Sequence, residues 1–271
     1  MPRRTSVTLH FAERGEGVPV LALHGWNPDH RLMLGCLEPV FTHRTGYRRL
    51  YPDLPAMGKS PAPPTIASSD DMLDAVQDFV DDMIGDAPFL LIGESYGGYL
   101  ARALAGSRPE QVLALALICP IGTAVDSAER RLPERQAVRS DPELLTSLDP
   151  RTADLFTDLA VVQTPTTLHR TREEVIPGLE AADTDAMARI AQRYTLTQSP
   201  EGAEPFLRPA LIITGRQDHI VGYADQFDLL PHYPRATYAV IDTAGHNLQI
   251  EQPELFNALI SEWLDRAAAT R

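Results

Sequence analysis

Short apolar runs recur along most of the chain, with polar or helical stretches between them. They occupy residues 18–23, 47–51, 88–92, 112–118, 209–214 and 238–242. The run at 112–118 is wholly apolar, as a strand covered on both faces should be. Between two runs, Met72, Val76, Phe79 and Val80 follow helical spacing behind the N-cap candidates at 68–69, with aspartates on the opposite side. Strands that alternate with helices predict a doubly wound, mostly parallel α/β sheet.

The two ends of this pattern add further elements. Residues 7–11 alternate apolar and polar positions, and Gly15 and Gly17 follow them, which predicts a hairpin-like start of the sheet. Near the end of the chain, apolar residues at helical spacing predict a last helix over 253–264.

The strand pattern stops in the middle of the chain. From about Thr123 to Pro205, short helical stretches replace it, and prolines interrupt them repeatedly. We therefore expect a core formed by residues 1–122 and 207–271, with a helical segment over 123–206 inserted between its two parts.

One strand ends in a motif that carries chemistry. The run at 88–92 leads directly into Gly93-Glu94-Ser95-Tyr96-Gly97-Gly98 and then into a helix. Gly-x-Ser-x-Gly in this setting holds a serine hydroxyl on a sharp turn at the carboxyl edge of a sheet. A serine hydroxyl is a weak nucleophile alone, so a nucleophilic Ser95 needs a base and an orienting acid.

Candidates for both partners follow later strands. Asp218 stands in the turn Gly215-Arg216-Gln217-Asp218 behind the run at 209–214, and His246 follows the run at 238–242. Loops at the carboxyl ends of parallel strands converge, so these side chains are predicted to meet Ser95. Asp242, close to His246 in sequence, is an alternative acid.

With the order Ser95, Asp218, His246, the chain resembles the α/β-hydrolase superfamily, whose nucleophile comes first and histidine last. The resemblance implies an α/β-hydrolase fold and assigns 123–206 as a helical cap over the active site. Some relatives carry the acid after the preceding strand, which makes Asp126 the reserve candidate.

The resemblance also implies an oxyanion hole. The run at 18–23 ends in His24-Gly25-Trp26, and an early His-Gly-x turn in this family supplies one of two oxyanion donors. The donors would be the backbone amides of Trp26 and Tyr96. The turn differs from the HGGG of many lipases and from the HGGPG of proline iminopeptidases. This difference argues against a lipase and against a proline iminopeptidase.

These residues predict a serine hydrolase that cleaves a carboxylic ester or lactone of a small molecule through an acyl-enzyme. Cleavage of a C–C bond in a diketone, a haloperoxidase-like activity and a non-catalytic ligand-binding relative are the alternatives. The serine at position 95 argues against dehalogenase and epoxide-hydrolase chemistry, because relatives with those activities carry aspartate at this position of the turn.

Other polar and aromatic side chains have weaker interpretations. The rings of Trp26 and Tyr96 are candidate substrate-binding groups, and Glu94 is expected to point away into a local polar network. His24 is interpreted as a turn-stabilising residue. A cluster in the inserted segment, His169, Arg170 and Arg172, is better explained as a solvated helix face than as a site for an anionic substrate.

Composition narrows the class of protein. The net charge of −13 argues against nucleic acid as a partner, since a phosphate-binding surface needs a basic patch. No run reaches the roughly 18 apolar residues of a membrane span. The start Met1–Ser6 is basic, but no apolar stretch of signal-peptide length follows it. Cys36 and Cys119 lie far apart and are expected to be reduced thiols in a cytoplasmic protein.

The sequence offers no metal-ligand spacing and no dinucleotide-binding loop, so neither a metal nor a cofactor is expected. The sequence does not indicate the oligomeric state.

Overall fold

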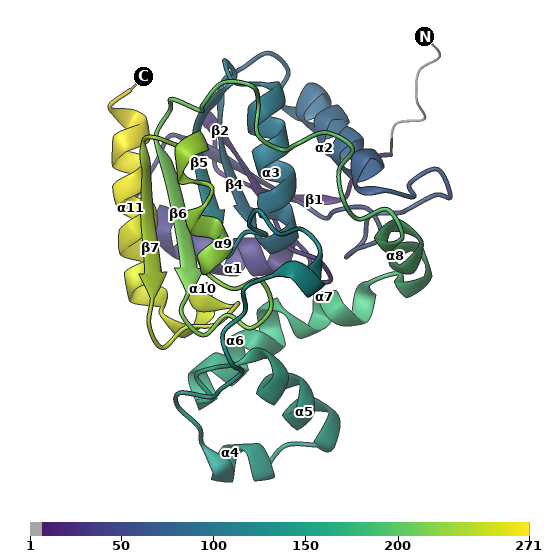
Figure 1. The fold of residues 1–271 in the computed structure, drawn as a ribbon, viewed down its shortest axis with the longest axis vertical. Helices are drawn as coiled ribbons and strands as arrows, with labels where there is room; N and C mark the ends of the chain where they lie inside the picture. Colours follow the sequence, from purple (N-terminus) through teal and green to yellow (C-terminus); the bar gives the residue numbers. More distant parts are fainter. Residues whose placement is uncertain (1–6, 271) are drawn as a thin grey trace.

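The centre of the molecule is a seven-stranded sheet, shown with its surrounding helices in Figure 1. The computed structural model describes residues 7–270, so the basic N-terminal stretch at 1–6 lies outside it. The strands are β1 (Phe11–Arg14), β2 (Val18–Leu23), β3 (Tyr47–Pro52), β4 (Phe89–Glu94), β5 (Val112–Ile118), β6 (Ala210–Gly215) and β7 (Ala236–Ile241). In space their order is β1-β3-β2-β4-β5-β6-β7. Only the β1–β3 pair is antiparallel, which confirms the predicted mostly parallel sheet.

Helices cover both faces of this sheet. Those of the core are α1 (His30–Phe41), α2 (Ser69–Met83), α3 (Ser95–Ser107), α9 (Ala224–Phe227), α10 (Leu248–Glu251) and α11 (Pro253–Ala268). Helix α1 packs beside α11 and α2 beside α3, and the two pairs lie on opposite faces (Figure 1). Within the described part of the chain, no helix has the length and apolar character needed to cross a membrane.

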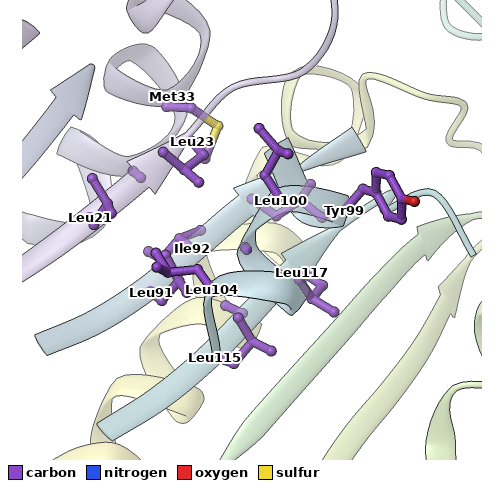
Figure 2. Close-up of a cluster of buried hydrophobic side chains, with 14 of the residues drawn as sticks. Leu21, Leu23, Met33, Leu91, Ile92, Tyr99, Leu100, Leu104, Leu115 and Leu117 are labelled. Carbon is purple, nitrogen blue, oxygen red and sulfur yellow. The ribbon is translucent and has the colours of Figure 1, made fainter. Parts of the chain in front are cut away.

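The interior is built from the central strands. Strands β4 and β6 are buried along their whole length, and all but one residue of β5 is buried as well. Figure 2 shows how leucines of β2, β4 and β5 pack with Leu100 and Leu104 of α3. Apolar surface on both faces of a parallel strand has to be covered by helices, and this packing fixes the carboxyl ends of the strands, from which the candidate site residues project.

Two features of the N-terminal region differ from the sequence prediction. The first strand covers Phe11–Arg14 rather than residues 7–11, and it does not form a hairpin with β2. The turn at Gly15–Gly17 carries the chain past the end of β3, where the Val18 N–H donates to the Gly46 carbonyl at 2.9 Å. Strand β2 therefore pairs on the far side of β3, and the hairpin-like start is wrong.

Helix α1 was not predicted at all. It contains Gly35 and Pro39, both of which are unfavourable inside a helix. Gly35 allows close packing against the inserted segment, because a Cβ there would lie 2.4 Å from Cδ of Glu174. The Asp29 side chain caps the helix by accepting from the Arg31 N–H at 3.0 Å. Tertiary packing thus outweighs the low local propensity.

The segment 123–206, here called the helical insertion, leaves the core after β5 and returns at β6. It contains the 3-10 helix η1 (Ser127–Glu129) and the helices α4 (Pro142–Thr146), α5 (Pro150–Leu159), α6 (Pro165–Glu174), α7 (Ile176–Ala181) and α8 (Thr184–Ala191). In Figure 1, α4 and α5 lie at the far end of the molecule from the C-terminal end of α11. Three of the prolines stand in the first turns of α4, α5 and α6, behind Asp141, Asp149 and Thr164 as N-caps. These three prolines, which interrupt the sequence pattern, mark helix starts.

The junction of β4 and α3 leaves no room for side chains at its glycines. A Cβ on Gly93 would lie 2.5 Å from the carbonyl oxygen of Gly97. One on Gly97 would lie 2.3 Å from the carbonyl oxygen of His24 and 2.5 Å from that of Leu23. The start of α3 is therefore pressed against the end of β2, so that the turns after β2 and β4 lie side by side.

We expect Gly97→Ala to destabilise the protein by roughly 1–3 kcal/mol or more, because the added methyl group meets rigid backbone. Gly202→Ala is the matched control, since the nearest atom to its Cβ is at an ordinary 3.4 Å. The midpoint of urea unfolding measures both effects. Equal midpoints for the two variants would show that the junction tolerates a Cβ.

Candidate active site

Ser95 occupies a strained position at the junction of β4 and α3. Its φ is +51°, in the left-handed region that costs a non-glycine residue about 1–2 kcal/mol. The Ser95 carbonyl accepts a hydrogen bond from the Ile121 N–H at 3.2 Å, which ties this turn to the end of β5. The side chain is thereby held at the carboxyl edge of the sheet, as the Gly-x-Ser-x-Gly motif predicts.

The structure brings Ser95, His246 and Asp218 into one hydrogen-bonded chain. His246 Nε2 lies 2.9 Å from Ser95 Oγ, and His246 Nδ1 lies 2.8 Å from Asp218 Oδ2. Because a carboxylate only accepts, Nδ1 carries the proton of the neutral ring and Nε2 faces the serine hydroxyl as an acceptor. The other Asp218 oxygen accepts from the N–H groups of Ile220 at 2.9 Å and Val221 at 3.0 Å. Both carboxylate oxygens of Asp218 are thus held by hydrogen bonds.

The two alternative acids lie in other hydrogen bonds. Asp126 caps η1 by accepting from the Ala128 N–H. Asp242 accepts from the Gln217 side chain at 2.8 Å and is exposed. Among the described contacts, neither carboxylate reaches His246.

A further carboxylate holds the loop that bears His246. Glu251 of α10 accepts from the Gly245 N–H at 2.6 Å through one oxygen. Through the other it accepts from the N–H groups of Val161 at 2.6 Å and Val162 at 3.1 Å. Sequence reasoning missed Glu251, because nothing in the local pattern shows that its partners come from the helical insertion. This side chain links the histidine loop to the insertion.

Glu94 does not point away into a polar network, contrary to the sequence prediction. Its Oε1 lies 3.4 Å from His246 Nε2, and its buried Oε2 has no hydrogen-bond partner. A Cβ on Gly25 would lie 2.3 Å from that Oε2, so the carboxyl group fills the space that the glycine leaves. Glu94 is the last residue of β4, so it lies at the carboxyl edge of the sheet beside the Gly25 turn. A second carboxyl group therefore faces the histidine.

Burial and charge pull the pKa values of these groups apart. Burial raises the pKa of Glu94 to about 7, although the His246 charge opposes it. For Asp218, burial is outweighed by the charge of His246 and by accepted hydrogen bonds, and the pKa lies below its usual range. Burial alone would lower the pKa of His246, but the charges of Asp218 and Glu94 and the hydrogen bond to Asp218 raise it. An imidazolium at this position is therefore stabilised.

Tyr96 and the turn that carries Trp26 both lie next to Ser95. Tyr96 is the second residue of α3, and the first N–H groups of a helix have no acceptor within it. The turn that carries Trp26 lies against the serine, since a Cβ on Gly25 would be 2.9 Å from Ser95 Cβ. His24 fixes this turn: its Nε2 accepts from the Leu54 N–H at 2.9 Å, and its Nδ1 donates to the Gly25 carbonyl at 2.8 Å.

The chain of polar groups opens into a pocket of about 280 Å³. Ser95, Glu94 and His246 lie at its polar end. The helical insertion contributes Leu159, Val175, Leu179, Arg130 and Tyr194 to the wall, and the core adds apolar side chains such as Leu32, Ile121 and Val221. The pocket is thus enclosed jointly by the core and the insertion.

Of the aromatic and basic side chains that the sequence suggested as substrate-binding groups, Trp26 lines the pocket and the others do not. Trp26 lines the pocket and stands edge-on to Tyr96, with ring centroids 4.9 Å apart. The Tyr96 ring lies behind the wall instead, fully buried, with its hydroxyl 2.7 Å from Ser69 Oγ. Arg170 pairs with Glu174, and His169 and Arg172 are exposed, so none of these three lines the pocket.

Two groups of described residues bring three potential metal ligands together. In one, both oxygens of Asp53 already accept from the imidazoles of His10 and His30, and they also accept backbone N–H groups. The other consists of Cys119, Asp218 and His246, and burial raises the pKa of the Cys119 thiol, which disfavours the thiolate that binds metals. Neither donor set points to a metal site.

We expect Glu94→Gln to lower the pKa of His246 by about one unit, because the substitution removes a negative charge near the imidazolium. Titration of the His246 ring protons by NMR measures this shift, with Asp242→Asn as a control that removes an equally charged but exposed side chain. An unchanged or raised pKa in Glu94→Gln would show that Glu94 does not act on the histidine.

Comparison with known proteins identifies the family of the chain. The sequence pattern of the family described as "alpha/beta hydrolase fold" matches residues 18–253. A 2-hydroxy-6-oxononadienedioate/2-hydroxy-6-oxononatrienedioate hydrolase of Burkholderia vietnamiensis is 28% identical over 97% of this chain and 92% of its own. Lipase LipV of Mycobacterium tuberculosis is 34% identical, over 46% of each chain. An alpha/beta superfamily hydrolase of Oenococcus oeni superposes with a TM-score of 0.87 at 28% identity, covering 96% of both chains. The chain belongs to the α/β-hydrolase fold family.

Proposed function

We propose that the protein is a serine hydrolase of small molecules, with Ser95 as nucleophile, His246 as general base and Asp218 as the orienting acid. The observation that carries the proposal is the continuous hydrogen-bonded chain from Ser95 Oγ through His246 to Asp218. It opens into the pocket shared by the core and the insertion.

The chemistry follows from this arrangement. His246 Nε2 takes the hydroxyl proton as Ser95 Oγ attacks a carbonyl carbon. Asp218 keeps the proton of the imidazole on Nδ1 and stabilises the imidazolium that forms. The alcohol leaves with a proton from Nε2, and the same nitrogen then activates water to release the acid and free Ser95.

The oxyanion of each tetrahedral intermediate would lie between the backbone amides of Trp26 and Tyr96. Tyr96 supplies an N–H at the start of α3, where the helix dipole also favours negative charge. In oxyanion holes of this type, loss of one donor costs about 2.7–4 kcal/mol of transition-state stabilisation.

The helical insertion would act as the cap that selects the substrate. It supplies one side of the pocket, while the core supplies the reacting groups. Because the pocket has a volume of about 280 Å³ and most of its lining side chains are apolar, a carboxylic ester or lactone with a small acyl group fits best. Cys36 and Cys119 are both buried and free, which suits the proposed cytoplasmic location.

Cleavage of a C–C bond is the second candidate. It is favoured by the similarity to the hydrolase of an oxononadienedioate noted above, at 28% identity over nearly the whole chain. The same serine would attack a ketone carbonyl, and the departing carbon would leave as an enolate that takes up a proton. Turnover of a dienoic diketone acid without turnover of simple esters would favour this candidate.

Reaction with a fluorophosphonate tests the nucleophile and the acid together. The native protein should gain one adduct, seen by intact mass, and Ser95→Ala none. Asp218→Asn should label on the order of 10³-fold more slowly, because the imidazole loses its tautomer and its counter-charge. Asp242→Asn should label at the native rate.

No adduct on the folded native protein would contradict the proposal and favour a ligand-binding relative of the fold. Slow labelling of Asp242→Asn or Asp126→Asn, with Asp218→Asn unaffected, would move the acid role to that residue.

A further inference from the structure

Arg130 places a positive charge in the wall of the Ser95 pocket. It follows η1 at the start of the helical insertion. Its Nη1 donates to the Ile220 carbonyl at 3.0 Å, and its Nη2 donates to the Val125 carbonyl at 2.8 Å. These acceptors fix the position of the guanidinium but, being neutral, leave its charge in place.

No carboxylate compensates this charge within the described part of the chain. The neighbouring Arg131 forms ion pairs with Asp225 and Asp228. Arg130, in contrast, forms no ion pair with any side chain of residues 7–270. Its Nε is buried and has no hydrogen-bond partner. A guanidinium has five N–H donors, and a buried donor without an acceptor is costly. The side chain therefore has unused capacity to bind an anion.

The surroundings of Arg130 connect it to the reacting groups. Together with Trp26 and Tyr194, it lines both the Ser95 pocket and an adjoining depression of about 520 Å³. Asp126 lines the outer depression only. After burial, Asp218 and Glu94, the Arg130 charge is a further influence on the pKa of His246, and it acts to lower it. The guanidinium is thus within electrostatic reach of the imidazole.

We infer that Arg130 forms an anion subsite of the Ser95 pocket, and that the substrate carries a carboxylate close to its scissile carbonyl. The inference rests on the proposed serine hydrolase function and narrows its substrate class. Arg170 and Arg172, the arginines that the sequence makes conspicuous, are paired or exposed outside the pocket. A planar guanidinium matches a carboxylate in a two-point hydrogen bond.

Matched ester pairs test the subsite. One pair is mono-para-nitrophenyl glutarate against para-nitrophenyl hexanoate, with the carboxylate in the acyl part. The other is para-acetoxybenzoate against its methyl ester, with the carboxylate in the alcohol part. For each pair, the ratio of kcat/KM for the anionic to the neutral ester is measured, corrected for spontaneous hydrolysis. The ratio is internal to each protein, so partial unfolding of a variant cancels.

In at least one pair, Arg130→Gln should lower this ratio roughly ten- to hundredfold, the range expected for a charge-assisted hydrogen bond. Arg130→Lys should fall between it and the native protein. Arg172→Gln, which removes the same charge from an exposed site, should leave the ratio unchanged. Ratios in Arg130→Gln equal to the native ones in both pairs would overturn the subsite and assign Arg130 a purely structural role.

Calorimetric binding of the same esters to Ser95→Ala separates this inference from the proposed function. If the native protein turns over no ester but Ser95→Ala binds an anionic ester more tightly than its neutral partner, and Ser95→Ala/Arg130→Gln does not, the subsite stands and the hydrolase proposal fails. If neutral esters are hydrolysed and neither binding nor turnover depends on Arg130, the hydrolase proposal stands and the subsite fails.

Discussion

The close approach of the β4–α3 junction to the end of β2 is the constraint on which the site depends. Backbone oxygens of Leu23 and His24 occupy the space that a side chain at Gly97 would need. This contact brings the Trp26 turn against Ser95, which has a left-handed conformation. The energy of the strained serine is offset by the buried apolar sheet behind it, since all of β4 is inaccessible to solvent.

Ionisable groups are concentrated at the carboxyl ends of the strands. The number of hydrogen-bond donors that stabilise their negative charges differs from one carboxyl group to the next. Asp218 accepts from His246 and from two backbone N–H groups, and Glu251 accepts from three backbone N–H groups. Glu94 has no such set of donors, and its charge is opposed chiefly by His246. Two carboxyl groups therefore face one imidazole from different sides, which favours the cation that forms during proton transfer. Arg130 lines the same pocket, and it is the residue that we infer binds an anionic group of the substrate.

The sequence was most informative where structure is local. Mostly apolar runs located β4, β5 and β6 to within about two residues, because a strand buried on both faces has few polar positions. Ser95, Asp218 and His246 could be proposed because each stands in the turn or loop that follows a predicted strand. Helix α1 could not, since Gly35 and Pro39 conceal a helix that tertiary packing stabilises.

Long-range contacts were beyond what the sequence could predict. The orientation of Glu94 was predicted wrongly, because its neighbours Gly25 and His246 come from turns that follow other strands. Glu251 and Arg130 acquire their roles from partners about 90 residues away in sequence, across the boundary between core and insertion. No periodicity encodes such pairs.

The central claim is that Ser95 becomes acylated during turnover. The most direct measurement mixes the protein with an activated ester, quenches the reaction with acid within milliseconds, and locates the added acyl mass by peptide mass spectrometry. The account predicts the acyl group on the peptide that contains Ser95, and on that residue alone. Turnover without an acylated Ser95, or with the acyl group on another residue, would contradict it.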